Sequence, residues 1–286
     1  TSSSLGPIFP PSIVFVLYAV LANVSIGAMF LAGIVPALLI AGVHFIYIYF
    51  YARKKGLRKL PLPKIKEFLV SLWRAIPALL VPVVILGGIF SGFFTATESG
   101  AMACLVALII GFATRNIRLR DLPKILIKAG ITTAGISFIV ATSNILGWSL
   151  AFEEVPRKVT EIFLAISENP LVILLLINVI LLLVGMFLDI TAAMLIMVPV
   201  LVPVVTSLGV DPIHFGLIIS LNLVIGLCTP PVGTVLFITS GVVKVPLHRL
   251  VRACIPLILW MLVVLLVVTY IPPVSLYLPK LFGLIQ

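Results

Sequence analysis

The chain has 286 residues, of which 62% are hydrophobic and 10% are charged, and its formal net charge is +10. Its mean hydropathy is +1.33. A soluble domain does not need so much apolar surface, so the composition predicts a bundle of apolar segments, each about 20 residues long, in a lipid bilayer. Cys104, Cys228 and Cys254 have no spacing typical of a zinc site or a disulfide framework, and we expect them to be small core residues.

In chain order, the first apolar segment is a short half-helix over 11–23, and a turn at 25–27 separates it from a spanning helix over 28–51. An amphipathic helix with a Trp anchor is expected at the interface over 65–73, and a second amphipathic segment over 153–167. Further spanning helices are expected over 76–90, 99–114, 130–151 and 253–270.

The region 170–203 is the densest apolar stretch, and a polar interruption at 185–191 divides it. Each flank has about 16 residues, which is short for a full crossing, so we expect a re-entrant hairpin with a polar tip. Asp211 and Pro212 predict an N-cap and first position of the next half-helix, which ends at a break over 228–233. The half-helix resumes over 234–243.

A weak repeat with an offset of 220 residues connects the two ends of the chain. The offset holds at Gly6/Gly226, Pro10/Pro230, Pro11/Pro231 and Pro36/Pro256. Because Pro and Gly interrupt helices, each copy predicts a membrane helix that breaks and resumes. Paired broken segments in two halves of one chain are typical of secondary transporters, and the breaks indicate the binding site.

The repeat also predicts that residues are missing upstream. The second copy begins near Ile76 and reaches its motif at Gly226, which is 226 − 76 = 150 residues later, whereas five residues precede Gly6. If the copies match in length, roughly 145 residues are absent before Thr1.

Basic residues predict the orientation. Of the 19 Lys and Arg residues, 16 fall into three clusters at 53–74, 115–128 and 244–252. If these clusters are cytoplasmic, the spans alternate consistently, provided that the hairpin does not cross. The acidic segment 151–169 and the C-terminus then lie outside, and the two broken helices are inverted. The positive charge is therefore interpreted as a topology signal and not as a nucleic-acid-binding surface.

The breaks leave backbone groups without helical partners, which is costly in a bilayer. A sodium ion suits the carbonyl oxygens, and the N-terminus of the resumed half-helix suits a carboxylate substrate. Hydroxyl groups that could face this carboxylate come from Ser4, Thr191 and Thr229. The alternative is that Pro-Pro only kinks each helix and that a Ser or Thr hydroxyl satisfies the backbone locally.

Two acidic residues lie deep within apolar sequence. Asp189, at the expected hairpin tip, is a candidate ion ligand, and capping of the returning helix is the alternative role. Glu98 follows Thr95 and Thr97 at a helix start, which favours a structural role in the first turn.

The remaining candidates for chemistry are weak. His214 is expected to pack or cap, His44 to lie in the core or at the interface, and His248 to belong to a basic amphipathic stretch. The sequence lacks the common metalloprotease, nucleophile-elbow and phosphate-loop motifs, so we expect a transporter driven by an ion gradient and not an enzyme.

Taken together, four segments resemble the large membrane subunit of tripartite ATP-independent periplasmic (TRAP) transporters. They are residues 2–12, 87–98, 185–191 and 226–233, which read SSSLGPIFPPS, GGIFSGFFTATE, GMFLDIT and GLCTPPVG. The resemblance covers essentially the whole chain and corresponds to the C-terminal two-thirds of the family.

The resemblance implies an all-α polytopic membrane protein of the elevator type, similar to the ion-transporter superfamily, with inverted repeats, broken helices and a re-entrant hairpin. It implies sodium-coupled import of an organic acid, such as a dicarboxylate or a sialic acid, across the inner membrane. The implied partners are a periplasmic binding protein and a small four-helix membrane subunit. One implied sodium site uses Gly6, Phe9 and Pro11, and the other uses Asp189, Gly226, Thr229 and Pro231.

Five segments follow from this interpretation. Residues 1–24 and 170–245 are expected in the transport domain, 25–75 form a span with a basic arm, 76–169 form scaffold helices, and 246–286 form the last span. Two other functions remain open: a stand-alone sodium/dicarboxylate symporter, and a membrane scaffold that does not transport.

Overall fold

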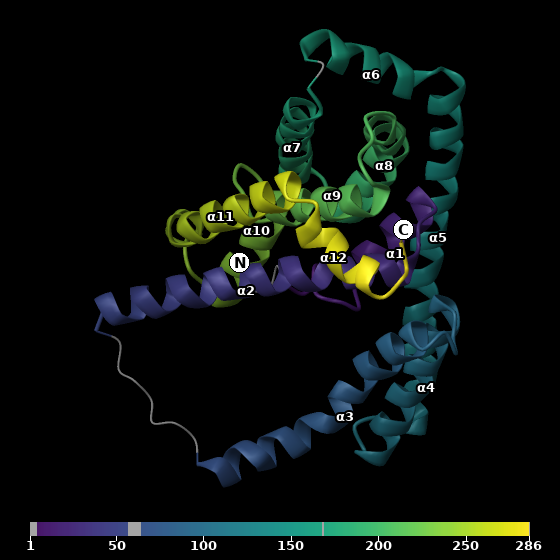
Figure 1. Ribbon diagram of the computed structural model, residues 1–286. Coiled ribbons are helices and arrows are strands. Elements are labelled where there is room, and N and C mark those ends of the chain that lie inside the picture. Colours follow the sequence, from purple (N-terminus) through teal and green to yellow (C-terminus); the bar gives the residue numbers. More distant parts are fainter. Residues whose placement is uncertain (1–4, 57–63, 168, 286) are drawn as a thin grey trace. The chain divides into compact units, whose positions relative to one another are not determined.

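The computed structural model describes residues 5–56, 64–167 and 169–285, and every regular element within these ranges is a helix (Figure 1). Seven of the described helices are long and apolar enough to cross a membrane. The expectation of an all-α polytopic membrane protein is thus confirmed for the described part of the chain.

The helices fall into two compact units, Thr1–Tyr49 with Ile139–Gln286, and Phe50–Phe138. The smaller unit contains α3 (Ile65–Phe90) and α4 (Ala96–Ala113). Two helices, α2 (Ile26–Lys54) and α5 (Leu122–Phe152), pass from one unit into the other, and a 3-10 turn (Leu119–Asp121) precedes α5. The helices of the larger unit are α1 (Ile13–Ala22), α6 (Val155–Ile166), α7 (Pro170–Phe187), α8 (Ile190–Ser207), α9 (Pro212–Leu227), α10 (Thr234–Val243), α11 (Leu247–Tyr270) and α12 (Pro273–Leu281).

In the smaller unit, α3 and α4 form an antiparallel pair joined by a short turn. Thr95 caps α4, and the backbone N–H of Thr95 donates to the Glu98 carboxylate over 2.8 Å. The structural role expected for Glu98 is therefore confirmed. α3 runs unbroken through Pro77 and Pro82, so the separate interfacial helix expected over 65–73 is wrong. Proline is tolerated inside membrane helices because neighbouring groups satisfy the freed backbone carbonyls.

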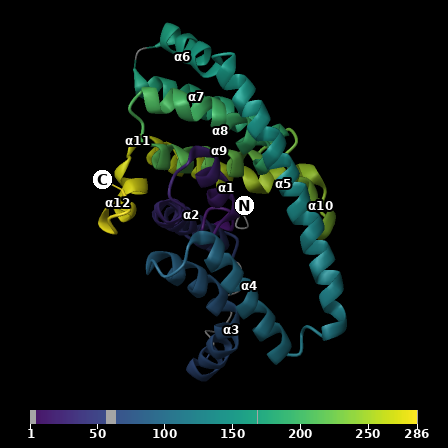
Figure 2. The same ribbon diagram turned by 90° about the vertical axis from the view of Figure 1, so that its right-hand side faces the viewer.

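The larger unit is built around α9, in which every residue from Ile213 to Gly226 is buried. α7, α8, α1 and α11 pack against it. Figure 1 and Figure 2 both show α7 and α8 on one side of α9. An apolar helix that is buried all round forms the core of a large helical protein, so α9 is the central element of this unit.

Small residues bring the N-terminal helices onto this core. A Cβ added at Gly216 of α9 would overlap the ring of Tyr18 in α1 and would lie 2.7 Å from the Met29 methyl group in α2. A Cβ at Gly33 would lie 2.9 Å from the carbonyl oxygen of Ile8. Such small residues allow the close helix–helix approach that is typical of membrane interfaces.

The two copies of the sequence repeat have the same order of elements. α1 and α10 each have 10 residues, and each is followed by a residue with positive φ, Asn23 at 54° and Lys244 at 56°. A long helix with one internal proline, Pro36 or Pro256, comes next. The Pro-Pro bond that precedes each half-helix is cis.

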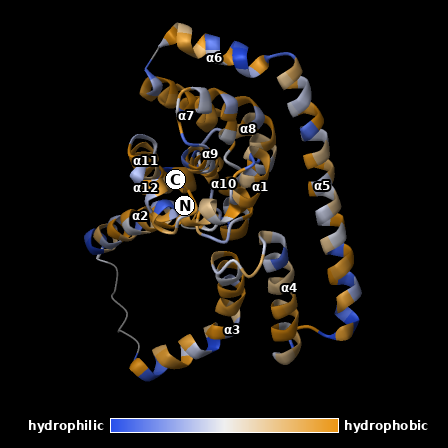
Figure 3. Ribbon diagram, turned by 45° about the vertical axis from the view of Figure 1, so that its right-hand side comes forward, coloured by the Kyte–Doolittle hydropathy of each residue, from blue (hydrophilic) through white to orange (hydrophobic). Residues whose placement is uncertain are grey.

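Several helix boundaries differ from those expected, and one helix is additional. α5 begins at Leu122 and α11 at Leu247, several residues before the apolar spans expected from 130 and 253, because the flanking basic residues lie on helical turns. α12 was not expected, and it starts at a Pro-Pro pair. α6 is the most polar helix in Figure 3, as its mixed charge predicts, and Arg157 pairs there with Glu154 and Glu161.

Candidate functional site

The two helices expected on either side of the polar interruption, α7 and α8, are present, and the chain turns between them at Leu188 and Asp189. Both are long and apolar enough to cross a membrane, so a re-entrant course stays a prediction. Each arm has 18 residues. The Asp189 carboxylate accepts a hydrogen bond from the Thr191 backbone N–H over 2.9 Å and so caps α8. The capping role is confirmed, and a role of Asp189 in ion binding stays a prediction.

The second break lies between α9 and α10, as expected. The Thr229 hydroxyl donates to the carbonyl oxygen of Ile225 over 2.7 Å, which satisfies one of the last carbonyls of α9 locally. α10 resumes after Gly233, which has a φ of 56°. Its first N–H groups point back toward the break, where a helix N-terminus favours negative charge.

The hairpin and the break meet through two glycines. A Cβ added at Gly226 would lie 2.6 Å from the carbonyl carbon of Gly185, and one at Gly185 would lie 3.1 Å from the Cα of Leu223. Because these neighbours are backbone atoms, they cannot move aside as a side chain could. α7 and α9 are therefore in backbone contact one turn before the hairpin tip.

A hydrogen bond extends this contact past the break. The backbone N–H of Gly233 donates to the carbonyl oxygen of Met186 over 3.4 Å. The end of α7 thus touches the chain on both sides of the break, at Gly226 and at Gly233. This arrangement gathers backbone carbonyls and amides from two separate segments into one place.

The first break has a different set of contacts. The Leu5 carbonyl accepts from the backbone N–H groups of Ile8 and Phe9, and the Ser12 hydroxyl donates to the Pro7 carbonyl. Gly6 and Phe9 are exposed, whereas Ile8 is buried. Ser4 lies outside the described residues.

The residues predicted for the second site differ in burial. Gly226 is buried, Thr229 and Thr191 are half-buried, and Asp189 and Pro231 are exposed. Among the described residues, no group of three or more His, Cys, Asp and Glu side chains could hold a metal ion. A sodium ion at this site, held by the Asp189 carboxylate together with backbone and hydroxyl oxygens, stays a prediction.

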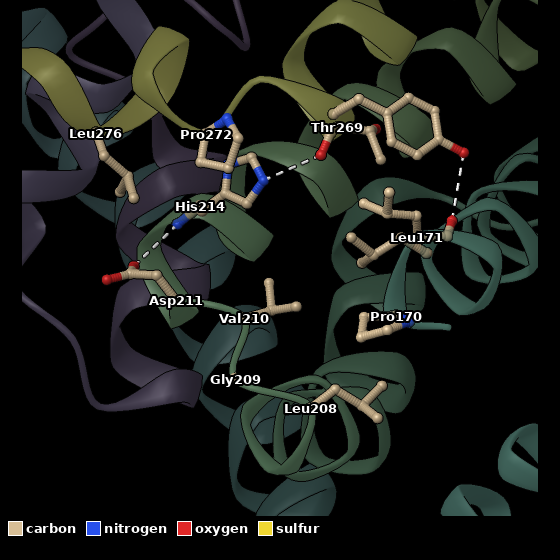
Figure 4. Close-up of a pocket in the computed structure, with 12 residues that line it drawn as sticks. Pro170, Leu171, Leu208, Gly209, Val210, Asp211, His214, Thr269, Pro272 and Leu276 are labelled. Carbon is tan, nitrogen blue, oxygen red and sulfur yellow. Dashed lines mark hydrogen bonds between the residues drawn. The ribbon is translucent and has the colours of Figure 1, made fainter. Parts of the chain in front are cut away.

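A cavity of about 320 Å³ lies at the opposite end of α9. Figure 4 shows that Asp211 and His214 face it from the start of α9, with Thr269 above them at the end of α11. Asp211 caps α9, as expected, through its hydrogen bonds to the backbone N–H groups of Ile213 and His214. The cavity is separated from the break by most of the length of α9, about 18 Å from His214 to Gly226 at 1.5 Å per residue.

His214 has the packing role that its position predicts. Its Nε2 lies 3.3 Å from the Thr269 carbonyl oxygen, which can only accept, so Nε2 carries the hydrogen. Its Nδ1 lies 2.6 Å from the Ser275 hydroxyl oxygen, and the single hydrogen of that hydroxyl is also within reach of the Pro272 carbonyl oxygen at 2.9 Å. His214 therefore holds the start of α12 against α9 and α11.

Sequence reasoning missed three buried polar residues inside apolar helices: Asn178 in α7, Asn222 in α9 and Thr269 in α11. Asn222 donates to the Asn178 side chain over 2.7 Å, and Asn178 donates to the Thr269 hydroxyl over 3.0 Å. A signal was present, because an amide within a long apolar run indicates a hydrogen-bonding partner in another helix.

Comparison with known proteins gives the family. Residues 1–274 match the model of the tripartite ATP-independent periplasmic transporter, DctM component. The chain belongs to the DctM family. Similar proteins include the sialic acid TRAP transporter large permease protein SiaM of Vibrio cholerae, with 43% identity, and the C4-dicarboxylate TRAP transporter large permease protein DctM of Pseudomonas aeruginosa, with 40%. An isethionate TRAP transporter permease protein, DctMQ, of Oleidesulfovibrio alaskensis is also 40% identical.

These alignments cover nearly all of the chain but not all of the relatives. They include 98%, 99% and 96% of the chain, but 66%, 66% and 44% of SiaM, DctM and DctMQ. The chain thus spans just under two thirds of the length of the first two relatives. Its relatives are transporter permeases and not enzymes, as the absence of enzyme motifs led us to expect.

Proposed function

We propose that the chain is part of a sodium-coupled importer of an organic acid in the inner membrane. Membership of the DctM family supports import, and the named relatives act on sialic acid, C4-dicarboxylates and isethionate, all of which are organic anions. The chain takes a substrate of this class, with a periplasmic binding protein and a small four-helix membrane subunit as partners. The basic clusters at 53–74, 115–128 and 244–252 are cytoplasmic.

The observation that carries this proposal is the contact between hairpin and break. Gly226 and Gly233 meet Gly185 and Met186, so backbone oxygens from two segments lie close together. Sodium binds between these segments and draws the hairpin tip toward the break. The substrate carboxylate binds nearby, at the N-terminus of α10 and at the hydroxyl groups of Thr191 and Thr229.

The first break supplies the other half of the mechanism. Gly6, Phe9 and Pro11 provide the backbone oxygens of a second sodium site, and α1 begins directly after them. Once both sites are filled, the domain that carries the breaks slides across the membrane and releases the acid inside. A substrate that binds without sodium does not close the hairpin, which prevents uncoupled movement.

Uptake into proteoliposomes tests the proposal. The full-length subunit with its small membrane subunit is offered labelled sialic acid, C4-dicarboxylates and isethionate, with and without an inward sodium gradient and the binding protein. We expect uptake of one acid that requires both sodium and the binding protein. Uptake with sodium alone would favour a stand-alone symporter, and no uptake of any acid would favour a scaffold that does not transport.

A pair of Asp variants tests the ion site itself. Asp189→Asn keeps an oxygen that can cap α8 but removes the negative charge. We expect this variant to raise the sodium concentration for half-maximal uptake roughly tenfold, because a charged ligand is lost. The matched control is Asp211→Asn, which changes the Asp that caps the far end of α9 and should leave the sodium dependence unchanged. The same sodium dependence in the two variants would mean that Asp189 only caps α8 and does not bind the ion.

A further inference from the structure

Three polar side chains are almost fully buried in the larger unit. Asn222 has 0% of its surface exposed, Asn178 has 2% and Thr269 has 1%. They come from α9, α7 and α11, three predominantly apolar helices. A buried polar group costs free energy unless it is hydrogen-bonded, so their bonds to one another constrain these helices.

The hydrogen bonds form a chain with a fixed direction. Asn222 donates through Nδ2 to Asn178 Oδ1, Asn178 donates to Thr269 Oγ1, and Thr269 donates to the Leu265 carbonyl over 2.8 Å. The Asn222 amide also donates to the carbonyl of Ile218 in its own helix over 2.8 Å. This series of hydrogen bonds ends at two backbone carbonyls, those of Ile218 and Leu265, which can only accept. The orientations of both Asn amides follow from this.

The same two helices meet again nearer to the candidate ion site. Gly226 lies four residues after Asn222, or about 6 Å along α9, and Gly185 lies seven residues after Asn178, or about 10 Å along α7. The amide pair and the glycine pair are thus two levels of one interface. A shift of one helix along the other by a single turn would separate both pairs at once.

We propose that Asn178, Asn222 and Thr269 are positioning residues that fix the register of α7 against α9. This role rests on the proposed function, because the register decides how far the Met186 carbonyl stands from the break and hence whether an ion is bound. Apolar contacts specify the register less strictly, since apolar side chains can repack in a neighbouring register. A buried Asn pair specifies the register more strictly, because the hydrogen bond from Asn222 Nδ2 to Asn178 Oδ1 requires these two residues to face each other. The Oδ1 atom of Asn222 is buried and has no hydrogen-bond partner among the described residues.

Thr269 connects α11 to both α7 and α9. Its hydroxyl accepts from Asn178, and its backbone carbonyl accepts from Nε2 of His214. α11 is therefore held to α7 through a side chain and to α9 through the backbone. In this proposal α7, α9 and α11 move as one body.

The test compares two substitutions of Thr269. Thr269→Val keeps the volume but removes the hydroxyl, whereas Thr269→Ser keeps the hydroxyl. In the complete transporter, Thr269→Val should raise the sodium concentration for half-maximal uptake roughly threefold to tenfold, and Thr269→Ser should behave like the wild type. Asn222→Leu should resemble Thr269→Val, and if it fails to fold, the Thr269 pair still decides the question.

Ser220→Ala is the matched control. Ser220 is also in α9 with 0% of its surface exposed, but its hydroxyl donates to the Gly216 carbonyl of its own helix. Its loss should leave the sodium dependence unchanged. A fall in maximal rate without a change in the sodium dependence of Thr269→Val would show a purely structural role and overturn the proposal.

Hydrogen exchange separates this proposal from the proposed function. In the purified complete transporter without sodium or substrate, backbone amides at 185–189 and 228–236 should exchange faster in Thr269→Val than in the wild type or Ser220→Ala. This measurement does not depend on transport, so it remains decisive if wild-type uptake needs no sodium and the proposed function fails. Identical exchange in Thr269→Val and the wild type would overturn the positioning role.

Discussion

α9 and α3 are both apolar helices, yet their surroundings differ. Every residue of α9 from Ile213 to Gly226 is buried, whereas Gly88 is the one residue of α3 that is buried in the described structure. Hydropathy alone does not distinguish them. The difference in burial follows from contacts of small and polar residues. Gly216 and Gly226 of α9 allow close approach of neighbouring helices, and Asn222 hydrogen-bonds to α7.

The physical reason is that lipid tails are as apolar as Leu side chains. Burial of apolar surface in protein gains little over burial in lipid, so helices associate in a membrane through close packing and hydrogen bonds. Backbone contact at Gly226 and the amide pair at Asn222 provide both for α9. α3 exposes residues such as Leu79 and Val83, which suit lipid without specific contacts.

Gly226→Ala should have the largest effect of the substitutions considered for this comparison. The new methyl group would lie 2.6 Å from the Gly185 carbonyl carbon, and two backbones would have to separate. We expect destabilisation of roughly 1–3 kcal/mol and loss of sodium-dependent uptake, because the hairpin would stand away from the break. Thermal melting of the purified transporter and proteoliposome uptake measure the two effects.

Gly241→Ala is the control for this variant. Gly241 lies in α10, and a Cβ added there meets nothing within 4 Å. Its substitution should leave both melting and uptake unchanged. Wild-type uptake by Gly226→Ala would mean that the backbone contact between α7 and α9 is not needed for the site.

Tyr18→Phe should have an intermediate effect. The ring of Tyr18 is fully buried, and its hydroxyl donates to the carbonyl of Pro212 over 2.5 Å, which joins α1 to the start of α9. Phe fills the same space without the hydrogen bond, so we expect a loss of about 1 kcal/mol and a fall of about 2–4 °C in melting temperature. Tyr277→Phe, at an exposed tyrosine of α12, should not change the melting temperature. Equal melting of Tyr18→Phe and the wild type would show that this bond adds nothing to the core.

Much of the fold could be predicted because its signals are local. The hairpin over 170–203 shows its turn through Asp189, and the start of α9 shows itself through Asp211 and Pro212. The continuity of α3 could not be predicted from its prolines, since the rule that Pro ends a helix is weaker in a membrane. α12 is short and amphipathic, and it lacks the length that identifies a span.

The candidate site was predictable in its segments but not in its contacts. The repeat identifies Gly226 as part of a break, yet the approach of Gly185 depends on how α7 packs on α9. Asn178 and Asn222 are 44 residues apart in sequence. The local sequence around one residue does not predict the other as its partner. Asp189 could be assigned a cap from sequence, whereas the proposed part of Asp189 in ion binding would also need oxygens contributed by other segments.

Leu79→Ala, in α3, should have the smallest effect. The side chain is 51% exposed, so little packing is lost, and we expect a change in stability within about 0.5 kcal/mol. Uptake should stay at the wild-type rate, because α3 contributes no residue to the break or the hairpin. A loss as large as that of Gly226→Ala, measured by melting of the complete transporter, would show that this face of α3 is covered by protein. Both helices would then be enclosed by protein. They would differ only in which protein segments cover them.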